Sequence, residues 1–155
     1  MSSEEVNSEE VSSEESKGDK DAAQERKMAV RSFHDSIVWQ KAMDLTSAIY
    51  RVTKVFPKEE MFGLTNQLRR ASVSIASNIA EGQGRLTTGE FLHFLGMARG
   101  SLQEVDTQLE IAKREGYADA KSLSSAQELV AEVSRILNAV IANLRKHKLK
   151  PSTNR

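Results

Sequence analysis

The sequence predicts an all-α fold, an antiparallel up-and-down four-helix bundle with a disordered acidic N-terminal tail. Four segments carry apolar residues at every third or fourth position, the spacing of one helix face. Gly or Pro follows each of these segments, so the connections between them are short and the helices should run antiparallel. No segment alternates polar and apolar residues, so no strand is expected.

The composition changes sharply near Ser32. Residues 1–31 repeat Ser-Glu-Glu and hold nine Asp or Glu against five Lys or Arg, with few large apolar residues to offset the entropy of ordering. We expect residues 1–31 to be a disordered tail that solubilises the chain, or alternatively an arm that masks the basic body against acidic ligands. The bundle should occupy residues 32–150, and residues 151–155 should form a short C-terminal tail.

Several classes of protein are disfavoured by what the sequence lacks. It contains no Cys, which removes disulfides, thiolate nucleophiles and cysteine metal sites. Its start lacks the basic and apolar regions of a secretory signal, and no apolar run is long enough to cross a bilayer. We therefore expect a soluble cytoplasmic protein with no membrane partner.

The first helix should cover residues 36–55, with Asp35 capping its start and Pro57 ending it. Its core stripe comprises Val38, Ala42, Leu45, Ile49, Val52 and Phe56. A second strip of Trp39, Met43, Thr46 and Tyr50 widens the apolar arc beyond what one bundle core requires. We therefore expect contact with another copy of the chain through Trp39, Met43 and Tyr50.

The second helix should cover residues 58–82 before Gly82 and Gly84 break it, with Glu59 and Glu60 at its positive N-terminal end. Its stripe comprises Leu64, Leu68, Ala71, Ile75 and Ile79. We interpret Gly82 and Gly84 as a helix end rather than a phosphate-binding loop, because they follow a helix and lack the Lys-Ser/Thr ending.

Thr87 and Glu90 form the pattern of a capping box that opens the third helix, which should end at Gly116. Its stripe comprises Phe91, Phe94, Leu95, Ala98, Leu102, Val105, Leu109 and Ala112. Asp119 should cap the fourth helix, whose stripe comprises Leu129, Val133, Ile136, Leu137, Val140 and Leu144.

Polar residues separated by three or four positions flank the stripes of the second and third helices, and we call these residues the polar ladder. If the two helices form a hairpin, pairs of ladder residues face each other. Arg85 should then meet Glu90 and Arg70 should meet Glu104, with small serines at the centre. The ladder comprises Gln67, Arg70, Ser74, Asn78, Glu81 and Arg85 on one helix, and Glu90, His93, Met97, Ser101, Glu104 and Gln108 on the other.

The polar ladder has two interpretations. Paired charges would fix the register of the helices, or the ladder would line a polar groove for a ligand. A catalytic role for Glu90, Glu104 or His93 would require an unpaired carboxylate in a cleft, whereas both acids are predicted to have arginine partners. We therefore expect no enzyme activity.

The sequence offers little to bind a metal. Glu90 and His93 form one Glu-x-x-His unit, whereas a carboxylate di-iron bundle needs that unit twice and two further Glu residues. The other histidines, His34 and His147, have no convincing ligand set. We expect no metal and no cofactor.

The basic residues predict a binding surface for nucleic acid. Individually they are solvated surface residues, but repeated around an oligomer they could form a phosphate-binding surface. The candidates are Lys41, Arg51, Lys54, Lys58, Arg69, Arg99, Lys113, Arg114, Arg145, Lys146, Lys148 and Lys150.

Five stretches also carry a family resemblance, namely 38–42, 49–50, 56–57, 62–85 and 90–117. Because of these stretches, the chain from Phe33 to Tyr117 resembles the four-helix-bundle proteins encoded in intervening sequences of bacterial 23S rRNA genes. The tail and the linker at 118–125 lie outside the pattern. The resemblance implies a bundle and a homo-oligomer, typically a pentamer. It also implies kinship with accessory proteins of diversity-generating retroelements, which bind nucleic acid and a reverse transcriptase.

These observations favour a non-catalytic homo-oligomeric bundle that binds RNA, DNA or a ribonucleoprotein partner through its basic outer surface. The alternative is a scaffold for protein–protein interaction with no affinity for nucleic acid.

Overall fold

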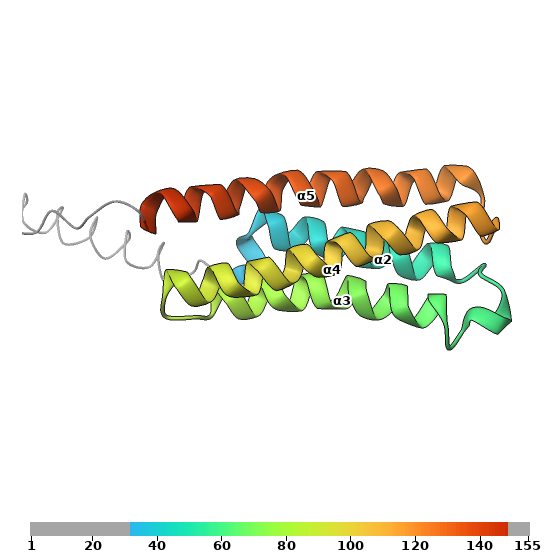
Figure 1. The fold of residues 1–155 in the computed structure, drawn as a ribbon, viewed down its shortest axis with the longest axis horizontal. Helices are drawn as coiled ribbons and strands as arrows, with labels where there is room; N and C mark the ends of the chain where they lie inside the picture. The colour runs from blue at the N-terminus through green and yellow to red at the C-terminus, as the bar shows by residue number, and fades with distance from the viewer. Residues whose placement is uncertain (1–31, 149–155) are drawn as a thin grey trace, which may run out of the picture. The chain divides into compact units, whose positions relative to one another are not determined.

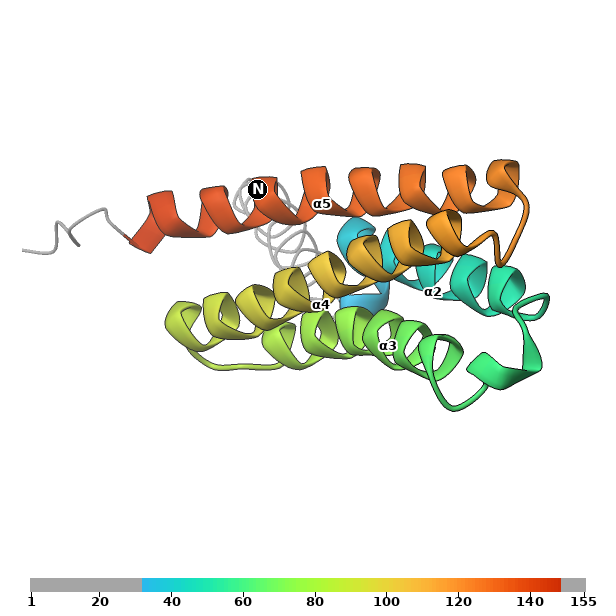
Figure 2. The same ribbon diagram turned by 45° about the vertical axis from the view of Figure 1, so that its right-hand side comes forward.

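The computed structural model describes residues 32–148, and within this range it is all-α (Figures 1 and 2). The predicted tails at 1–31 and 151–155 lie outside the described residues. Within the described residues, two 3₁₀ turns and four α-helices follow each other. They are η1 (Phe33–Asp35), α2 (Ile37–Thr53), η2 (Lys58–Glu60), α3 (Leu64–Gln83), α4 (Thr88–Glu115) and α5 (Ala120–Lys148).

The four α-helices form the predicted antiparallel bundle. Each packs against two others: α3 lies between α2 and α4, and α5 closes the bundle against α4 and α2. The predicted stripes of the first two helices are buried, and so is that of α4 from Leu95 to Ala112. Because each helix has only one largely apolar side, burial against two neighbours explains why the four are stable together.

The stripe predicted for α5 is rotated from the one that the structure buries. Val133 and Leu137 are fully buried as expected, whereas the other four predicted residues are only half-buried. The apolar arc of α5 is wide, and the helix packs against both α2 and α4, so the centre of that arc faces the core. The buried residues are Leu123, Ala126, Val130, Val133, Leu137 and Ile141.

The start of α2 differs from the prediction by one residue. Ser36 is the N-cap, and its Oγ accepts a hydrogen bond of 3.4 Å from the backbone N of Trp39. Asp35 lies instead in η1, and α2 ends at Thr53 rather than Val55.

The helix predicted over 58–82 is in fact a 3₁₀ turn, a loop and then α3. Glu60 connects these parts, because one carboxylate oxygen accepts a 2.8 Å hydrogen bond from the Leu64 backbone N and the other accepts a 3.0 Å bond from the Tyr117 hydroxyl. A Cβ at Gly63 would lie 2.6 Å from Glu60 Oε2. Glu60 therefore satisfies the N-terminus of α3 from outside the helix.

The remaining predicted helix ends are confirmed. Thr87 Oγ1 accepts a hydrogen bond from Glu90 N at 3.2 Å, and Gly116 ends α4 with a φ of 69°, a conformation that favours glycine. Asp119 Oδ1 accepts a 2.9 Å bond from Ser122 N at the start of α5. Hydrogen bonds from the Ser122 hydroxyl and amide lower the pKa of Asp119.

Candidate functional site

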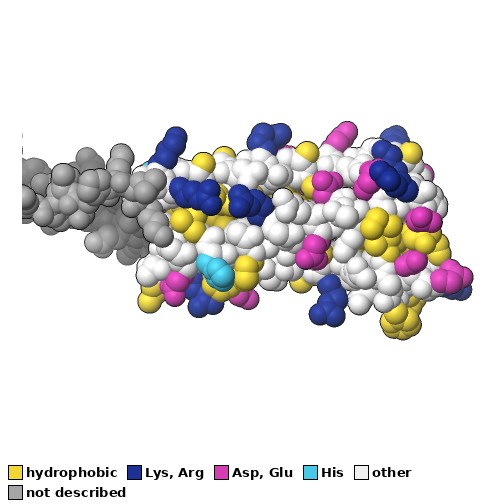
Figure 3. All heavy atoms as spheres, viewed as in Figure 1, with side chains coloured by type: hydrophobic (Ala, Val, Ile, Leu, Met, Phe, Trp, Pro, Cys, Tyr) yellow, Lys and Arg dark blue, Asp and Glu magenta, His cyan; other side chains and the backbone are white. Residues whose placement is uncertain are grey.

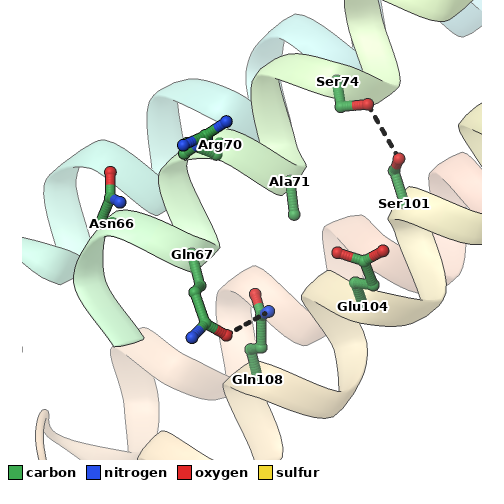
Figure 4. Close-up of a pocket in the computed structure, with 8 residues that line it drawn as sticks. All are labelled: Asn66, Gln67, Arg70, Ala71, Ser74, Ser101, Glu104 and Gln108. Atoms are coloured by element: carbon green, nitrogen blue, oxygen red, sulfur yellow. Dashed lines mark hydrogen bonds between the residues drawn. The ribbon is translucent and has the colours of Figure 1, made fainter. Parts of the chain in front are cut away.

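The polar ladder lies along the outer seam between α3 and α4, in the register that the sequence predicts. Ser74 and Ser101 share a hydrogen bond of 2.9 Å, and Gln108 Nε2 donates to Gln67 Oε1 at 3.3 Å (Figure 4). Asn78 extends this network by donating to the Ser74 hydroxyl at 3.0 Å. Neutral contacts between facing residues therefore connect the two helices.

The predicted ion pairs of the ladder are wrong. Within residues 32–148, side-chain ion pairs join Lys41 to Glu132 and Arg114 to Glu110, and neither Arg70 nor Glu104 takes part in one. Figure 4 shows the Arg70 side chain directed away from Glu104. Both residues are exposed, so water solvates each charge, and holding two long side chains together would stabilise the fold little.

Arg85 and Glu90 also have other partners. Arg85 follows the end of α3 and lies outside the helix, and its guanidinium stacks 4.4 Å from the centre of the Phe94 ring. A Glu90 carboxylate oxygen accepts a 3.1 Å hydrogen bond from the Thr87 hydroxyl. The prediction failed here because the loop turns Arg85 towards an aromatic ring.

A groove of about 480 Å³ follows the ladder at the α3–α4 seam. Amide, hydroxyl, guanidinium and carboxylate groups line it, and the Oε1 atom of Gln108 is buried without a hydrogen-bond partner among the described residues. Glu104 has no ion-pair partner within residues 32–148, which removes the ground on which we expected no catalysis. It is exposed, however, and no second acid and no His lines this groove to act with it. The lining residues are Asn66, Gln67, Arg70, Ala71, Ser74, Ser101, Glu104 and Gln108 (Figure 4).

The other end of the ladder is more open. Glu81, His93 and Met97 are exposed on α3 and α4, and the His93 ring packs edge-on against Phe94 at 5.8 Å. Within the described part of the chain, no three His, Asp or Glu side chains gather in a way that could hold a metal ion.

The basic residues do not form one continuous patch on the face shown in Figure 3. Lys and Arg side chains are spread along the molecule there, with Asp and Glu among them. Lys41 binds Glu132 at 3.1 Å, and Arg114 binds Glu110 at 3.4 Å. Arg69 stacks 4.8 Å from the centre of the Tyr50 ring. These three cations therefore have partners in their own chain.

Other candidates remain accessible. Arg51, Lys54, Lys58 and Lys113 are exposed at the end of the bundle where α2 and α4 finish. Cations also stabilise the negative ends of helices, so the monomer alone can account for part of this distribution. Arg99 is half-buried, whereas Arg145 and Lys146 are exposed in the last turns of α5. Lys148 ends that helix, and Lys150 lies outside the described residues.

The strip predicted to contact another copy lies partly against its own chain. Trp39 is half-buried and packs edge-on against the rings of Phe33 and His34, at 5.3 and 4.9 Å. Thr46 donates a hydrogen bond of 3.1 Å to the Ser72 carbonyl of α3. Part of the second apolar strip of α2 therefore contacts residues of its own chain.

Two of the three predicted interface residues keep exposed surface. Met43 is 39% exposed and Tyr50 is 42% exposed, although the Arg69 guanidinium covers one face of the Tyr50 ring. Contact between copies through these residues stays a prediction.

The sequence prediction missed two strongly exposed apolar residues at the tips of loops. Phe62 is 91% exposed and Leu86 is 98% exposed. The sequence pattern places Phe62 near the start of a helix, where a single apolar residue does not indicate an exposed side chain. Gly63 directly after it was the signal that the chain turns there.

Residues 34–139 match the family model described as 23S rRNA-intervening sequence protein. The chain belongs to this family. Within residues 32–148, no helix combines the length and the apolar character that a membrane span requires.

A solved structure has a fold similar to that of this chain. A protein of unknown function from the S23 ribosomal protein family of Bacteroides thetaiotaomicron VPI-5482 has a TM-score of 0.63 and 23% sequence identity to this chain. The match covers 68% of this chain and 98% of the other. At this identity the likeness concerns the fold alone. No curated protein matches the chain.

Proposed function

We propose that this member of the 23S rRNA-intervening sequence protein family is a non-catalytic homo-oligomer that binds nucleic acid through exposed basic residues. The observation that carries the proposal is the group of Arg51, Lys54, Lys58 and Lys113 at one end of the bundle. None of these four side chains forms an ion pair with a described residue, so all four could reach phosphates. An oligomer would repeat the group once per copy.

The family name supports nucleic acid as the ligand, because it places the genes of these proteins within 23S rRNA sequences. A ribonucleoprotein partner, such as one that contains a reverse transcriptase, would use the same surface. Such a ligand implies a cytoplasmic location.

Binding at rising salt tests the proposal. Structured RNA or duplex DNA should bind at low salt, and the logarithm of the affinity should fall linearly with the logarithm of salt concentration. In the double variant Lys54→Gln, Lys113→Gln, the slope for duplex DNA should shrink by about 0.9 for each phosphate that the protein no longer neutralises. Fluorescence anisotropy measures both quantities.

A matched control removes the same charge elsewhere. The variant Arg70→Gln, Arg135→Gln also loses two exposed cations, both outside the proposed surface, and should bind with nearly the wild-type slope. Failure of the wild-type chain to bind either probe at low salt would contradict the proposal. The probes should also remain intact on a denaturing gel, and their cleavage would contradict the non-catalytic part.

The second candidate is a protein–protein interaction scaffold without affinity for nucleic acid. The mixture of charges in Figure 3 and the exposed apolar residues Phe62 and Val55 favour it. A stable oligomer that leaves both probes unbound at low salt would support this candidate.

A further inference from the structure

The turn between α2 and α3 displays a large apolar side chain to solvent. Phe62 exposes 91% of its surface, and the neighbouring Met61 exposes 57%. A single exposed apolar residue is common, but an aromatic residue at the tip of a turn has the size and shape of an interface anchor. Phe62 can therefore contact another molecule without any rearrangement of the chain that carries it.

This turn is held in place by several contacts. Glu60 accepts hydrogen bonds from Leu64 N and from the Tyr117 hydroxyl, and the Tyr117 ring packs 5.8 Å from the ring of Phe56. The Gly63 backbone N donates to the Glu60 carbonyl at 3.0 Å. Because the turn is already ordered, binding through Phe62 would lose little further conformational entropy.

A groove of about 370 Å³ lies between α2 and α5, and it has room for an aromatic ring. Val52 and Ala126 are buried in its floor, and Ala48 and Leu129 beside them are half-buried. Its exposed rim is polar apart from Val55. The remaining lining residues are Arg51, Val55, Asp119, Ser122 and Ser125.

Phe62 and this groove lie at the same end of the bundle but on opposite edges. The groove is formed by the end of α2 and the start of α5, and the η2 turn follows directly after α2. In Figures 1 and 2 the η2 turn lies at the α3 edge, and α5 forms the opposite edge. Two copies standing side by side would place the turn of one next to the groove of the other.

We propose that Phe62 of one copy inserts into the α2–α5 groove of a second copy. Charges on both surfaces are complementary: Lys58 and Glu59 flank the Phe62 turn, and Asp119 and Arg51 stand on the rim of the groove. Lys54 and Lys113 of the basic group lie outside this contact and would remain for phosphates in the oligomer. Because the two surfaces differ, the contact is heterologous, and its repetition closes a ring when the rotation between copies permits. This inference rests on the proposed homo-oligomer and specifies its interface.

Truncation of Phe62 tests the contact. The Phe62→Ala variant should lower the oligomer mass in light scattering and weaken self-association at least tenfold, with helical content unchanged because the side chain is exposed. Leu86→Ala is the matched control, since Leu86 is equally exposed at the opposite end of the bundle, and it should assemble as the wild type does. Ser125→Trp, which fills the groove, should act like Phe62→Ala.

Cross-linking tests the geometry with Phe62 in place. The chain has no Cys, so each variant carries a single thiol. A Met61→Cys variant mixed with a Ser125→Cys variant should form a mixed disulfide under oxidation. A mixture of Leu86→Cys and Ser125→Cys should not. Making the two variants of different length lets a gel distinguish the mixed product from disulfides between identical copies.

The outcomes separate this inference from the proposed function. A wild-type chain that is monomeric would overturn both the homo-oligomer and the contact. A wild-type oligomer that survives Phe62→Ala and Ser125→Trp, or that gives no Met61–Ser125 cross-link, would overturn the contact and leave the homo-oligomer standing.

Discussion

Glycines inside α3 and α4 differ in what surrounds them. A Cβ at Gly82 would lie 2.8 Å from Phe91 Cδ2 and 3.0 Å from Phe94 Cβ, because α3 and α4 approach closely near their hairpin. A Cβ at Gly96 would meet no atom within 4 Å. Glycine is therefore required by packing at the first position and only lowers helix propensity at the second.

We expect substitution by alanine to have opposite effects at these two positions. Gly82→Ala should destabilise the bundle by about 1–3 kcal/mol through overpacking, although alanine is the better helix former. Gly96→Ala should stabilise it by up to about 1 kcal/mol. Urea unfolding followed by circular dichroism measures both. Equal effects at the two positions would mean that Gly82 does not mark a close helix contact.

Arg70 provides a second prediction at the scale of single residues. Because Arg70 and Glu104 are exposed and form no ion pair with a described residue, Arg70→Ala should change the free energy of unfolding by less than about 1 kcal/mol. A loss of about 3 kcal/mol would indicate a buried pair. Thermal unfolding at low and high salt distinguishes these cases.

The outcome at the ladder shows how far single residues can be predicted. Periodicity and the hairpin placed Ser74 opposite Ser101 and Gln67 opposite Gln108, because backbone register follows from helix geometry. The partners of Arg70 and Arg85 could not be predicted in the same way. Long exposed side chains have many rotamers, and solvent or a nearby ring competes with any acid in reach.

At the scale of elements, the turn before α3 depends on a contact that sequence patterns do not reveal. Glu60 and Tyr117 are 57 residues apart, and their hydrogen bond joins the turn to the end of α4. Over 58–82 the apolar pattern favours one continuous helix, and Gly63 is the local signal of a break in it. The sequence could therefore have indicated the boundary, but not that Glu60 holds the turn by bonding a distant hydroxyl.

The Glu60–Tyr117 contact should make stability depend on alkaline pH. The hydrogen bond to Glu60 is the main cause of a raised Tyr117 pKa, with burial and the Glu60 charge adding to it. A raised folded-state pKa stabilises the fold at pH values below the ordinary tyrosine pKa of about 10, and this stabilisation is lost as pH rises through the folded value.

Urea unfolding between pH 8 and pH 11 checks this dependence. Tyr117→Phe should be less stable than the wild type near pH 8, and the difference should narrow above pH 10. Tyr50→Phe is the control, because the Tyr50 hydroxyl has no such carboxylate partner among the described residues, and its difference from the wild type should not narrow in this way. A constant difference for Tyr117→Phe would contradict the role of the Glu60 contact.

At the scale of the whole molecule, the fold followed from the apolar stripes far more directly than the site did. Four stripes and their breakers specified the bundle, because each helix had to bury one side against the others. The buried face of α5 was predicted with the wrong rotation about the helix axis, because the apolar arc of this helix is wide and more than one stripe within it could face the core. The sequence could not predict which basic side chains stay unpaired, because the packing of the helices decides which cations have partners. Lys41 and Arg69 are two that do.

The uncharged contacts between α3 and α4 have a practical consequence for experiments. Dissolved ions weaken attractions between exposed charges but act little on the Ser74–Ser101 and Gln67–Gln108 hydrogen bonds. Raising the ionic strength should therefore leave the alignment of this hairpin intact. A fall in ligand affinity under those conditions would then report on the contact with the ligand, without a hidden contribution from a loosened protein.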